Sequence, residues 1–263
     1  MWLMDISSSI TLTFQGGASK VERCTLRSGA DAFRKTGEME AIAREVNSLQ
    51  NLVNSSRLVK TPQLVAFGDN WLATDWLEGS NLAETFAKTD DDGERIAICE
   101  RFGSVLCAST AISSRTPESE STFDTMFEML EAAVNAGTDR VIRDPDSFID
   151  GHSVRDVWRA LVNDADSIIP EIRYCQGDWC LPNVMTRGID AAELGVIVDW
   201  SEAGWMDWRF CIADGLWSIG YNSRLAGVNP ADYHLAFLRS CGFSMDAGEI
   251  TWHRKLRALM TLI

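Results

Sequence analysis

The sequence lacks the clustered residues that build common metal sites and the paired cysteines of disulfide frameworks. Its 263 residues include three His, and its seven Cys are odd in number, irregularly spaced and without a Cys-x-x-Cys pair. A zinc site needs clustered Cys and His, and a small secreted scaffold needs paired Cys, so the sequence argues against both classes. The pattern instead indicates buried, reduced thiols and predicts a cytoplasmic protein.

Long apolar runs and an excess of positive charge are also lacking. No apolar run reaches the roughly 18 residues of a membrane span, and the first residues lack the basic and apolar regions of a signal peptide. The net charge of −14 makes nucleic acid and anionic membranes poor partners. A cationic small molecule is compatible with that charge, although acidity is more often a matter of solubility. A content of 46 % hydrophobic residues is enough for one large domain or two packed lobes.

The most informative stretch runs from Tyr174 to Asp199. Asp178 follows a Gly, Asn183 comes five residues later, and Asp199 ends the apolar run 194–198, which is typical of a buried strand. Phosphoryl transfer from a nucleotide needs a carboxylate to accept a hydroxyl proton, and an amide and a second carboxylate to hold Mg²⁺. A turn with capping Asp and Asn is the alternative, but it leaves the strand before Asp199 unexplained.

The string Gly-Asp-x4-Asn followed by Val-Ile-Val-Asp resembles the motifs of the aminoglycoside phosphotransferase family of small-molecule kinases. Its fuller form, Gly-Asp-x-Cys-Leu-Pro-Asn, is similar to the 3'-phosphotransferase branch. The resemblance implies a protein-kinase-like α+β fold with two lobes. Residues 1–76 would form a β-rich nucleotide-binding lobe with a small antiparallel sheet. Residues 77–263 would form a larger helical lobe with the catalytic loop, the metal site and the acceptor pocket.

The resemblance also implies a function and a role for each motif residue. The activity would be transfer of the γ-phosphate of ATP or GTP to a hydroxyl of a small molecule, with Mg²⁺ as cofactor. An aminoglycoside antibiotic is one candidate acceptor, which would make the protein a resistance enzyme. Asp178 would orient and deprotonate the hydroxyl, and Asn183 and Asp199 would bind Mg²⁺.

Two charged residues upstream match the family's phosphate-binding pair. Residues 32–35 predict a strand, and apolar residues at helical spacing predict a helix over about 37–53. On the resemblance, Lys35 would hold the α- and β-phosphates and Glu45 would orient it. The alternative is that both are solvated surface charges, with Arg34 and Glu38 as rival candidates for the two roles.

Two more segments of the first lobe are expected to contact the nucleotide. An alternating strand over 8–14 is followed by Gly16, Gly17 and Ser19, and then by a second strand. Such a loop can lay backbone N–H groups on phosphates, although an ordinary hairpin also uses Gly-Gly. Residues 61–77 predict two strands joined by a turn at 68–70. In the family, backbone groups from about Asp75 to Leu77 then hydrogen-bond the purine.

Helical patterns dominate the rest of the chain. Aspartates at 90–92 can cap a helix that runs to about residue 112. A loop is expected over 143–153 and a short strand before residue 175. The further expected helices span about 123–134, 154–169, 209–221, 229–242 and 246 to the last residue.

Three positions depart from the family pattern. Gln176 stands where the family has His, Cys211 where it has Asp, and Glu202 where the 3'-phosphotransferases have Arg. We expect Gln176, and Asp214 one turn after Cys211, to serve as hydrogen-bonding scaffold for the catalytic loop. These departures keep open a non-catalytic nucleotide-binding relative. A protein kinase is a further alternative, against which the chain lacks His-Arg-Asp before the loop and Ala-Pro-Glu after it.

Overall fold

The computed structural model describes residues 6–12, 19–52, 59–110, 122–137, 140–186 and 195–261. The chain forms two compact units. The first comprises residues 1–81, 176–178 and 183–203, and the second comprises residues 82–175, 179–182 and 204–263. Two segments that are distant in the sequence therefore complete the N-terminal unit.

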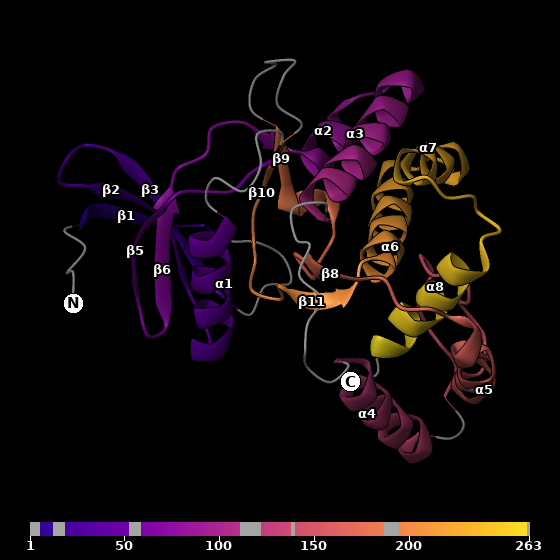
Figure 1. Ribbon diagram of the computed structural model, residues 1–263. Helices are drawn as coiled ribbons and strands as arrows, with labels where there is room; N and C mark the ends of the chain where they lie inside the picture. Colours follow the sequence, from indigo (N-terminus) through magenta and orange to yellow (C-terminus); the bar gives the residue numbers. More distant parts are fainter. Residues whose placement is uncertain are drawn as a thin grey trace. The chain divides into compact units, whose positions relative to one another are not determined.

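A five-stranded antiparallel sheet with one helix forms most of the first unit (Figure 1). Helix α1, Met39–Leu52, lies along the sheet and contacts β5 and β6. Its apolar residues recur at helical spacing, so Ile42 and Val46 face inward and pack with Leu72. The strands, in their order across the sheet, are β1 Ile6–Leu12, β2 Lys20–Leu26, β3 Asp31–Thr36, β6 Trp71–Asp75 and β5 Leu64–Gly68.

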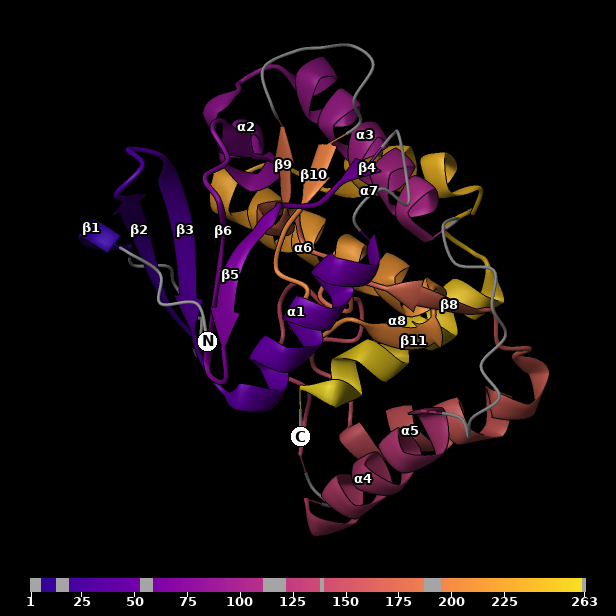
Figure 2. The ribbon, with the colours of Figure 1, turned by 60° about the vertical axis from the view of Figure 1, so that its left-hand side comes forward.

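A second, four-stranded sheet in the same unit holds the strand that precedes Asp199. Its central strand β10, Gly195–Ile197, is buried throughout, as its apolar sequence predicts. It pairs in parallel with β4, Val59–Lys60, and antiparallel with β9, Val184–Thr186 (Figure 2). Strand β7, Ser80–Asn81, completes the sheet. Asn183 thus stands directly before one of two paired strands, and Asp199 stands shortly after the other.

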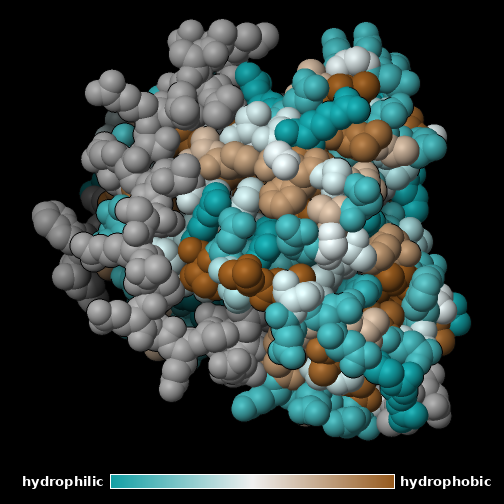
Figure 3. Space-filling view, turned by 45° about the vertical axis from the view of Figure 1, so that its right-hand side comes forward, coloured by the Kyte–Doolittle hydropathy of each residue, from teal (hydrophilic) through white to brown (hydrophobic). Residues whose placement is uncertain are grey.

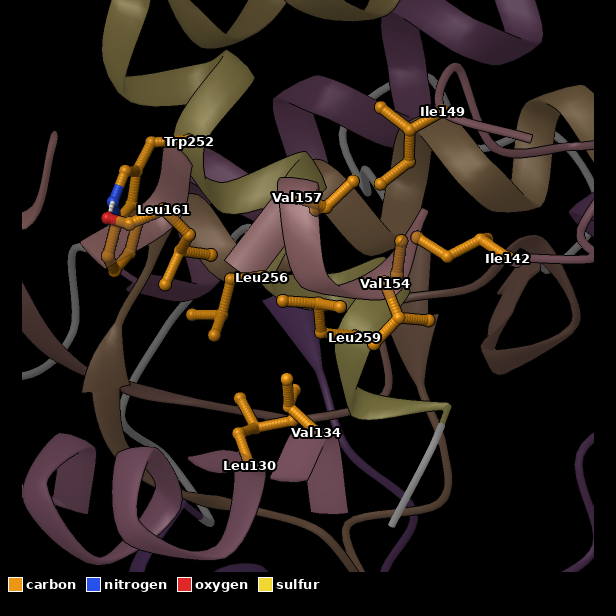
Figure 4. Packing of buried hydrophobic residues seen from close by; sticks show 11 residues of the cluster. Leu130, Val134, Ile142, Ile149, Val154, Val157, Leu161, Trp252, Leu256 and Leu259 are labelled. Carbon is orange, nitrogen blue, oxygen red and sulfur yellow. Dashed lines mark hydrogen bonds between the residues drawn. The ribbon is translucent and has the colours of Figure 1, made fainter. Parts of the chain in front are cut away.

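The second unit is mainly helical, and one of its hydrophobic clusters consists of buried aliphatic residues and one Trp (Figure 4). Leu130 of α4, Leu161 of α5 and Leu256 of α8 are completely buried in this cluster. Strands β8, Ile172–Cys175, and β11, Gly204–Asp207, pair antiparallel in the same unit. The helices are α2 Leu82–Lys88, α3 Asp92–Thr110, α4 Thr122–Ala136, α5 Val154–Asp164, α6 Arg209–Ala226, α7 Ala231–Cys241 and α8 Gly248–Met260.

Local signals explain where several of these helices begin and end. The Asp91 carboxylate accepts hydrogen bonds from the N–H groups of Gly93 and Glu94, at 2.7 and 3.3 Å, and so caps α3 as the aspartate run predicts. Helices α6 and α7 end at Gly227 and Gly242, whose φ angles of 72° and 81° suit residues without a Cβ.

Other expectations about these elements need correction. The helix expected over 154–169 ends at Asp164 and continues as a 3₁₀ turn, Ala165–Ser167. Val162, an apolar residue of this helix, is 45 % exposed. Helix α6 continues past its expected end at residue 221, and α2 and β11 had no predicted counterpart. The last two are only seven and four residues long, too short for a periodic pattern to be distinguished.

Exposed hydrophobic side chains are scattered over both units. Ile169 is 81 % exposed, Leu225 63 % and Met39 62 %. On the face shown in Figure 3, hydrophobic residues form separate groups between hydrophilic ones. Among the described residues, no helix is both long and apolar enough to cross a membrane.

Candidate functional site

Three charged side chains from separate elements of the first unit meet in one network. The Lys35 ammonium on β3 lies 3.0 Å from a Glu45 carboxylate oxygen on α1. It lies 2.6 Å from an Asp199 oxygen in the segment after β10. Lys35 and Glu45 are only 6 % and 5 % exposed, so they are not the solvated surface charges of the alternative interpretation. The rivals Arg34 and Glu38 do not take part in these contacts: Arg34 stacks on the Trp71 ring, and Glu38 is exposed.

The electrostatics of this network favour the charged forms of Lys35 and Asp199. Burial would lower the pKa of Lys35, but the carboxylates of Glu45 and Asp199 outweigh it and raise that pKa. Burial would likewise raise the pKa of Asp199, but Lys35 outweighs it and lowers that pKa. Burial dominates at Glu45 and raises its pKa despite the neighbouring ammonium. Lys35 is therefore held as a cation at neutral pH.

Asp199 has an unusual backbone conformation. Its φ of 55° is the only positive φ at a described residue other than glycine. This conformation costs about 1–3 kcal/mol and persists where the surroundings impose it, which is common at functional sites. The Ser201 hydroxyl and N–H donate to the same Asp199 oxygen that contacts Lys35, at 2.7 and 3.4 Å. The carboxylate is thus fixed through one oxygen, while the side chain is still 41 % exposed.

Gln176 joins the backbone on both sides of the site. Its side-chain nitrogen donates to the carbonyl oxygens of Val198, at 3.3 Å, and of Asp199. Its side-chain oxygen accepts from the Asp178 N–H at 2.9 Å. The residue is 2 % exposed, so these bonds satisfy backbone groups in a buried region. This is the double role, towards a carbonyl and an N–H, that a scaffold residue needs.

Gly177 explains why the chain can turn between Gln176 and Asp178. Its φ is 93°, and a Cβ placed there would lie 2.0 Å from the Glu202 carbonyl oxygen. Only glycine fits this close backbone approach. The turn leaves the Asp178 side chain exposed, beyond the buried Gln176.

Asn183 is bonded to the residue expected to be the catalytic base. Its side-chain nitrogen donates to the Asp178 carbonyl oxygen and to one Asp178 carboxylate oxygen, both at 3.0 Å. Its own carbonyl oxygen accepts from the Val198 N–H at 3.0 Å. With the nitrogen directed at Asp178, the amide oxygen is the Asn183 atom suited to a metal.

Three contacts that no sequence motif predicted tie α1 to the segment after Asp199. The second Glu45 oxygen accepts from the Trp200 N–H at 3.2 Å. Arg44 donates from Nε to the Ser201 carbonyl oxygen at 2.8 Å, and its guanidinium lies 3.9 Å from the Glu202 carboxylate. Glu202, at the position where the sequence comparison expected the Arg of the 3'-phosphotransferases, thus faces an arginine supplied by the helix.

The other residues predicted to contact the nucleotide are placed as follows. Ser19 is half-buried and lies next to Gly37, which directly follows β3. A Cβ added to Gly37 would lie 2.7 Å from the Ser19 hydroxyl oxygen. Gly16 and Gly17 lie outside the described residues. Asp75 ends β6, and its N–H donates to the Gln63 carbonyl at 3.0 Å. Leu77 follows in an irregular segment.

Asp214 lies in the second unit and pairs with Arg257 at 3.0 Å. Its role as scaffold for the catalytic loop stays a prediction, and Cys211, one turn earlier, is fully buried. One turn later, the Ser218 hydroxyl accepts a hydrogen bond from the Leu181 N–H at 2.9 Å. Leu181 lies between Asp178 and Asn183 in the sequence. Sequence reasoning missed Ser218, because a lone serine inside a helix carries no motif.

The oxygen atoms of Asn183 and Asp199 are hard ligands of the kind that Mg²⁺ prefers. Within the described ranges, no three His, Cys, Asp or Glu side chains group closely enough to hold a metal alone. A Mg²⁺ site of two protein ligands, completed by phosphate oxygens and water, needs no such group. The residues present therefore fit this cation.

Comparison with known proteins is consistent with this arrangement. The model of a family described as the phosphotransferase enzyme family matches residues 21–240. No curated protein sequence matches the chain.

Solved structures of small-molecule kinases are similar over nearly the whole chain. An aminoglycoside 3'-phosphotransferase of type VIII is 20 % identical, with a TM-score of 0.67 over 95 % of this chain and 93 % of that one. The GDP complex of aminoglycoside 2'-phosphotransferase-IIIa is 15 % identical, with a TM-score of 0.67 over 98 % and 84 %. A choline/ethanolamine kinase family protein from Mesorhizobium loti is 15 % identical, with a TM-score of 0.65 over 96 % and 78 %. These likenesses confirm the predicted kinase-like α+β fold.

Proposed function

Because the chain belongs to the phosphotransferase enzyme family, we propose that it transfers the γ-phosphate of ATP or GTP to a hydroxyl of a small molecule. The observation that carries the proposal is the contact of Lys35 with both Glu45 and Asp199. A buried cation fixed beside an exposed carboxylate is what a nucleotide's phosphates and their metal require.

At the donor end, Lys35 holds the phosphates. An ammonium has three N–H donors, and two of them are directed at Glu45 and Asp199. The third can bind a phosphate oxygen without breaking the network. The Gly16–Ser19 loop covers the phosphates in this proposal.

The purine is held by backbone groups after β6. The N–H groups of Asp75 and Trp76 donate to the carbonyls of Gln63 and Asp31. In this proposal, backbone groups from about Asp75 to Leu77 hydrogen-bond the purine.

At the acceptor end, Asp178 receives the proton of the attacking hydroxyl. Its carboxylate is exposed. The Asn183 amide donates to one of the carboxylate oxygens and to the Asp178 carbonyl, and the Gln176 side chain accepts from the Asp178 N–H. A base held in one orientation aligns the hydroxyl with the phosphorus, which is the main catalytic requirement for this reaction.

Asn183 and Asp199 would hold Mg²⁺ through their side-chain oxygens. When bound, the ion neutralises charge on the β- and γ-phosphates. The Asp199 oxygen that accepts from Ser201 and Lys35 is already fixed, so the other oxygen presents the better ligand.

The acceptor is a small molecule whose hydroxyl reaches Asp178. The similar structures include enzymes named for aminoglycosides and for choline or ethanolamine. A net charge of −14 suits a cationic acceptor of either kind. We therefore place hydroxyl-bearing cations first and neutral sugars second.

The test is a nucleotide-consumption assay over a panel of aminoglycosides, choline-like amino alcohols and neutral sugars, with ATP and GTP in parallel. The proposal expects acceptor-dependent release of ADP or GDP and a phosphorylated acceptor by mass spectrometry. Nucleotide binding without turnover on any acceptor would indicate the non-catalytic relative instead.

Binding of the nucleotide is tested separately with Asp199→Ala. We expect this change to remove the Mg²⁺-dependent part of nucleotide affinity, because water cannot replace the carboxylate without misplacing the phosphates. Calorimetry with and without Mg²⁺ measures it, and Asp69→Ala, at an exposed turn, is the control. Unchanged Mg²⁺-dependent affinity would mean that the metal binds elsewhere.

A further inference from the structure

Helices α3 and α7 of the second unit pack unusually closely. Gly103 of α3 faces α7, and a Cβ there would lie 2.7 Å from the Phe237 carbonyl oxygen and 2.8 Å from the Ser240 Cβ. A missing side chain thus allows the two backbones to approach. Cys107 stands one turn further along α3, and Cys241 ends α7.

The two thiols occupy this contact together. The Cys107 sulfur lies 3.5 Å from the Ser240 carbonyl oxygen, and the Cys241 sulfur lies 3.8 Å from the Gly103 carbonyl oxygen. The Cys107 sulfur thus lies beside the residue that precedes Cys241, and the Cys241 sulfur lies beside a residue one turn before Cys107. Both cysteines are free thiols; Cys107 is half-buried, whereas Cys241 is buried.

The surroundings give the two sulfurs different chemistry. The neighbouring Cys241 thiol lowers the pKa of Cys107; burial opposes this shift, and the Arg173 guanidinium supports it. The proximity of Cys107, together with burial, raises the pKa of Cys241. Cys107 is therefore the more nucleophilic and the more accessible of the two, and Cys241 is placed to react second.

We propose that Cys107 and Cys241 form a peroxide-reactive dithiol that closes to a disulfide between α3 and α7. The Cys107 thiolate attacks one peroxide oxygen, so that an S–O bond forms, the O–O bond breaks and hydroxide leaves. Sulfur is oxidised by two electrons to the sulfenic acid, and the peroxide is reduced. The Cys241 sulfur then attacks the Cys107 sulfur and loses its proton, the S–O bond breaks, and water leaves. In sum, two thiols and one hydrogen peroxide give one disulfide and two waters.

This modification site is independent of the proposed phosphotransfer, because both cysteines and their contacts lie within the second unit. Its test therefore reads the state of the sulfurs and not turnover. The full chain is treated with hydrogen peroxide at neutral pH, alkylated, digested without reductant and mapped by mass spectrometry.

We expect a peptide pair linked through Cys107 and Cys241 that separates on reduction. Cys99, on the same helix, is the internal control, since burial raises its pKa to about 12 and leaves it no thiolate at neutral pH. Free Cys107 after treatment would overturn the proposal. Cys107 carried to the sulfinic acid beside a free Cys241, or linked to another cysteine, would overturn it as well.

Two variants check the order of the steps. In Cys241→Ser the sulfenic acid at Cys107 has no partner, so a dimedone-type reagent should label Cys107. In Cys107→Ser we expect neither label nor disulfide at Cys241. Labelling of Cys241 in the second variant would show that the assignment of the first nucleophile is wrong. If either variant fails to fold, the peptide map of the oxidised wild-type protein still decides whether the disulfide forms.

Discussion

The carboxylate of Asp178 is exposed, while Gln176 and Asn183 fix the atoms around it. Asp178→Asn should therefore remove the proton acceptor without disturbing the Lys35 network. We predict a loss in kcat of about 10²–10⁴, the usual contribution of a general base. Nucleotide affinity should stay within about threefold of wild type, because on the proposed function this carboxylate would face the acceptor hydroxyl and not the nucleotide.

Steady-state kinetics and calorimetry with nucleotide measure the two quantities. Asp69→Asn makes the same chemical change at an exposed turn and should alter neither. Full turnover by Asp178→Asn would show that another group accepts the proton.

Gln176 connects Asp178 to Asp199 through an uncharged side chain. We predict that Gln176→His is tolerated, with activity within about tenfold, roughly 1.4 kcal/mol of barrier, because a ring nitrogen can replace the amide donor. Gln176→Leu should leave buried backbone groups unpaired at about 1–3 kcal/mol each and lower both stability and rate.

Thermal unfolding and kinetics of the three proteins on one accepted substrate separate these outcomes. His also titrates near neutrality, so only Gln176→His should add a pH dependence to the rate. The scaffold role is wrong if Gln176→Leu equals wild type in both stability and rate.

At the scale of elements, α1 and the segment after β10 are joined by several contacts. Glu45 binds Lys35 and the Trp200 N–H, and Arg44 binds the Ser201 carbonyl. Both glutamate oxygens are engaged, so a shift of the helix would move the segment that carries Asp199. This arrangement lets one helix set the position of both Lys35, the proposed phosphate-binding residue, and Asp199, the proposed metal ligand.

Arg44 provides a test of that link. The charged Arg44 guanidinium donates a hydrogen bond to the Ser201 carbonyl oxygen at 2.8 Å. Its ion pair with Glu202 is longer, at 3.9 Å, and both of these side chains are exposed. Arg44→Gln should weaken Mg²⁺-nucleotide binding by roughly threefold to tenfold, about 1 kcal/mol. Glu202→Gln should have little effect, since exposed ion pairs contribute about 0–1 kcal/mol.

Arg44→Lys separates the charge from the hydrogen bond. Lysine keeps the positive charge near Glu202 but lacks the Nε–H group that donates to the Ser201 carbonyl oxygen. Calorimetry with Mg²⁺-nucleotide should find this variant as weak as Arg44→Gln. Wild-type affinity in Arg44→Lys would contradict the prediction and assign the effect to charge.

Elements with a distinct apolar pattern of their own could be predicted from the sequence, and elements without one could not. The amphipathic pattern of α1 and the apolar run of β10 were sufficient on their own. Strands β4 and β7 have two residues each and exist because the sheet pairs them. Pairing between residues that are distant in the sequence leaves no local signal.

The same limit applies to the candidate site. Motif spacing named Asp178, Asn183 and Asp199, but the bond from Trp200 to Glu45 joins positions 155 apart. Such a contact depends on how α1 packs, which spacing does not encode. The positive φ of Asp199 likewise follows from the surrounding bonds and not from its residue type.

At the scale of the whole molecule, acid should destabilise the fold through a buried histidine. His234 of α7 is 9 % exposed, and its Nε2 lies 2.8 Å from the Leu216 carbonyl oxygen on α6. Burial, together with the nearby Arg254 of α8, lowers the pKa of His234 from 6.5 to about 4. The folded protein therefore keeps this ring neutral, as a donor to Leu216, where the unfolded chain would protonate it.

The sign of the effect follows from proton binding. Between pH 6.5 and about 4 the unfolded chain holds the extra proton, so the free energy of unfolding falls as pH falls through this window. The loss from this one group should be roughly 2–4 kcal/mol by pH 4. Below about pH 4 the contribution of His234 to the free energy of unfolding stops changing, because the folded protein also binds the proton.

Thermal unfolding from pH 7 to pH 4 measures it, with His234→Gln as the variant. Glutamine can still donate to the Leu216 carbonyl but does not titrate, so its Tm should fall less steeply over this range. His152→Gln removes a histidine that is exposed in the same unit and should keep the wild-type dependence of Tm on pH. Equal slopes in His234→Gln and wild type would mean that other groups, such as the buried Asp207 carboxylate, set the acid sensitivity.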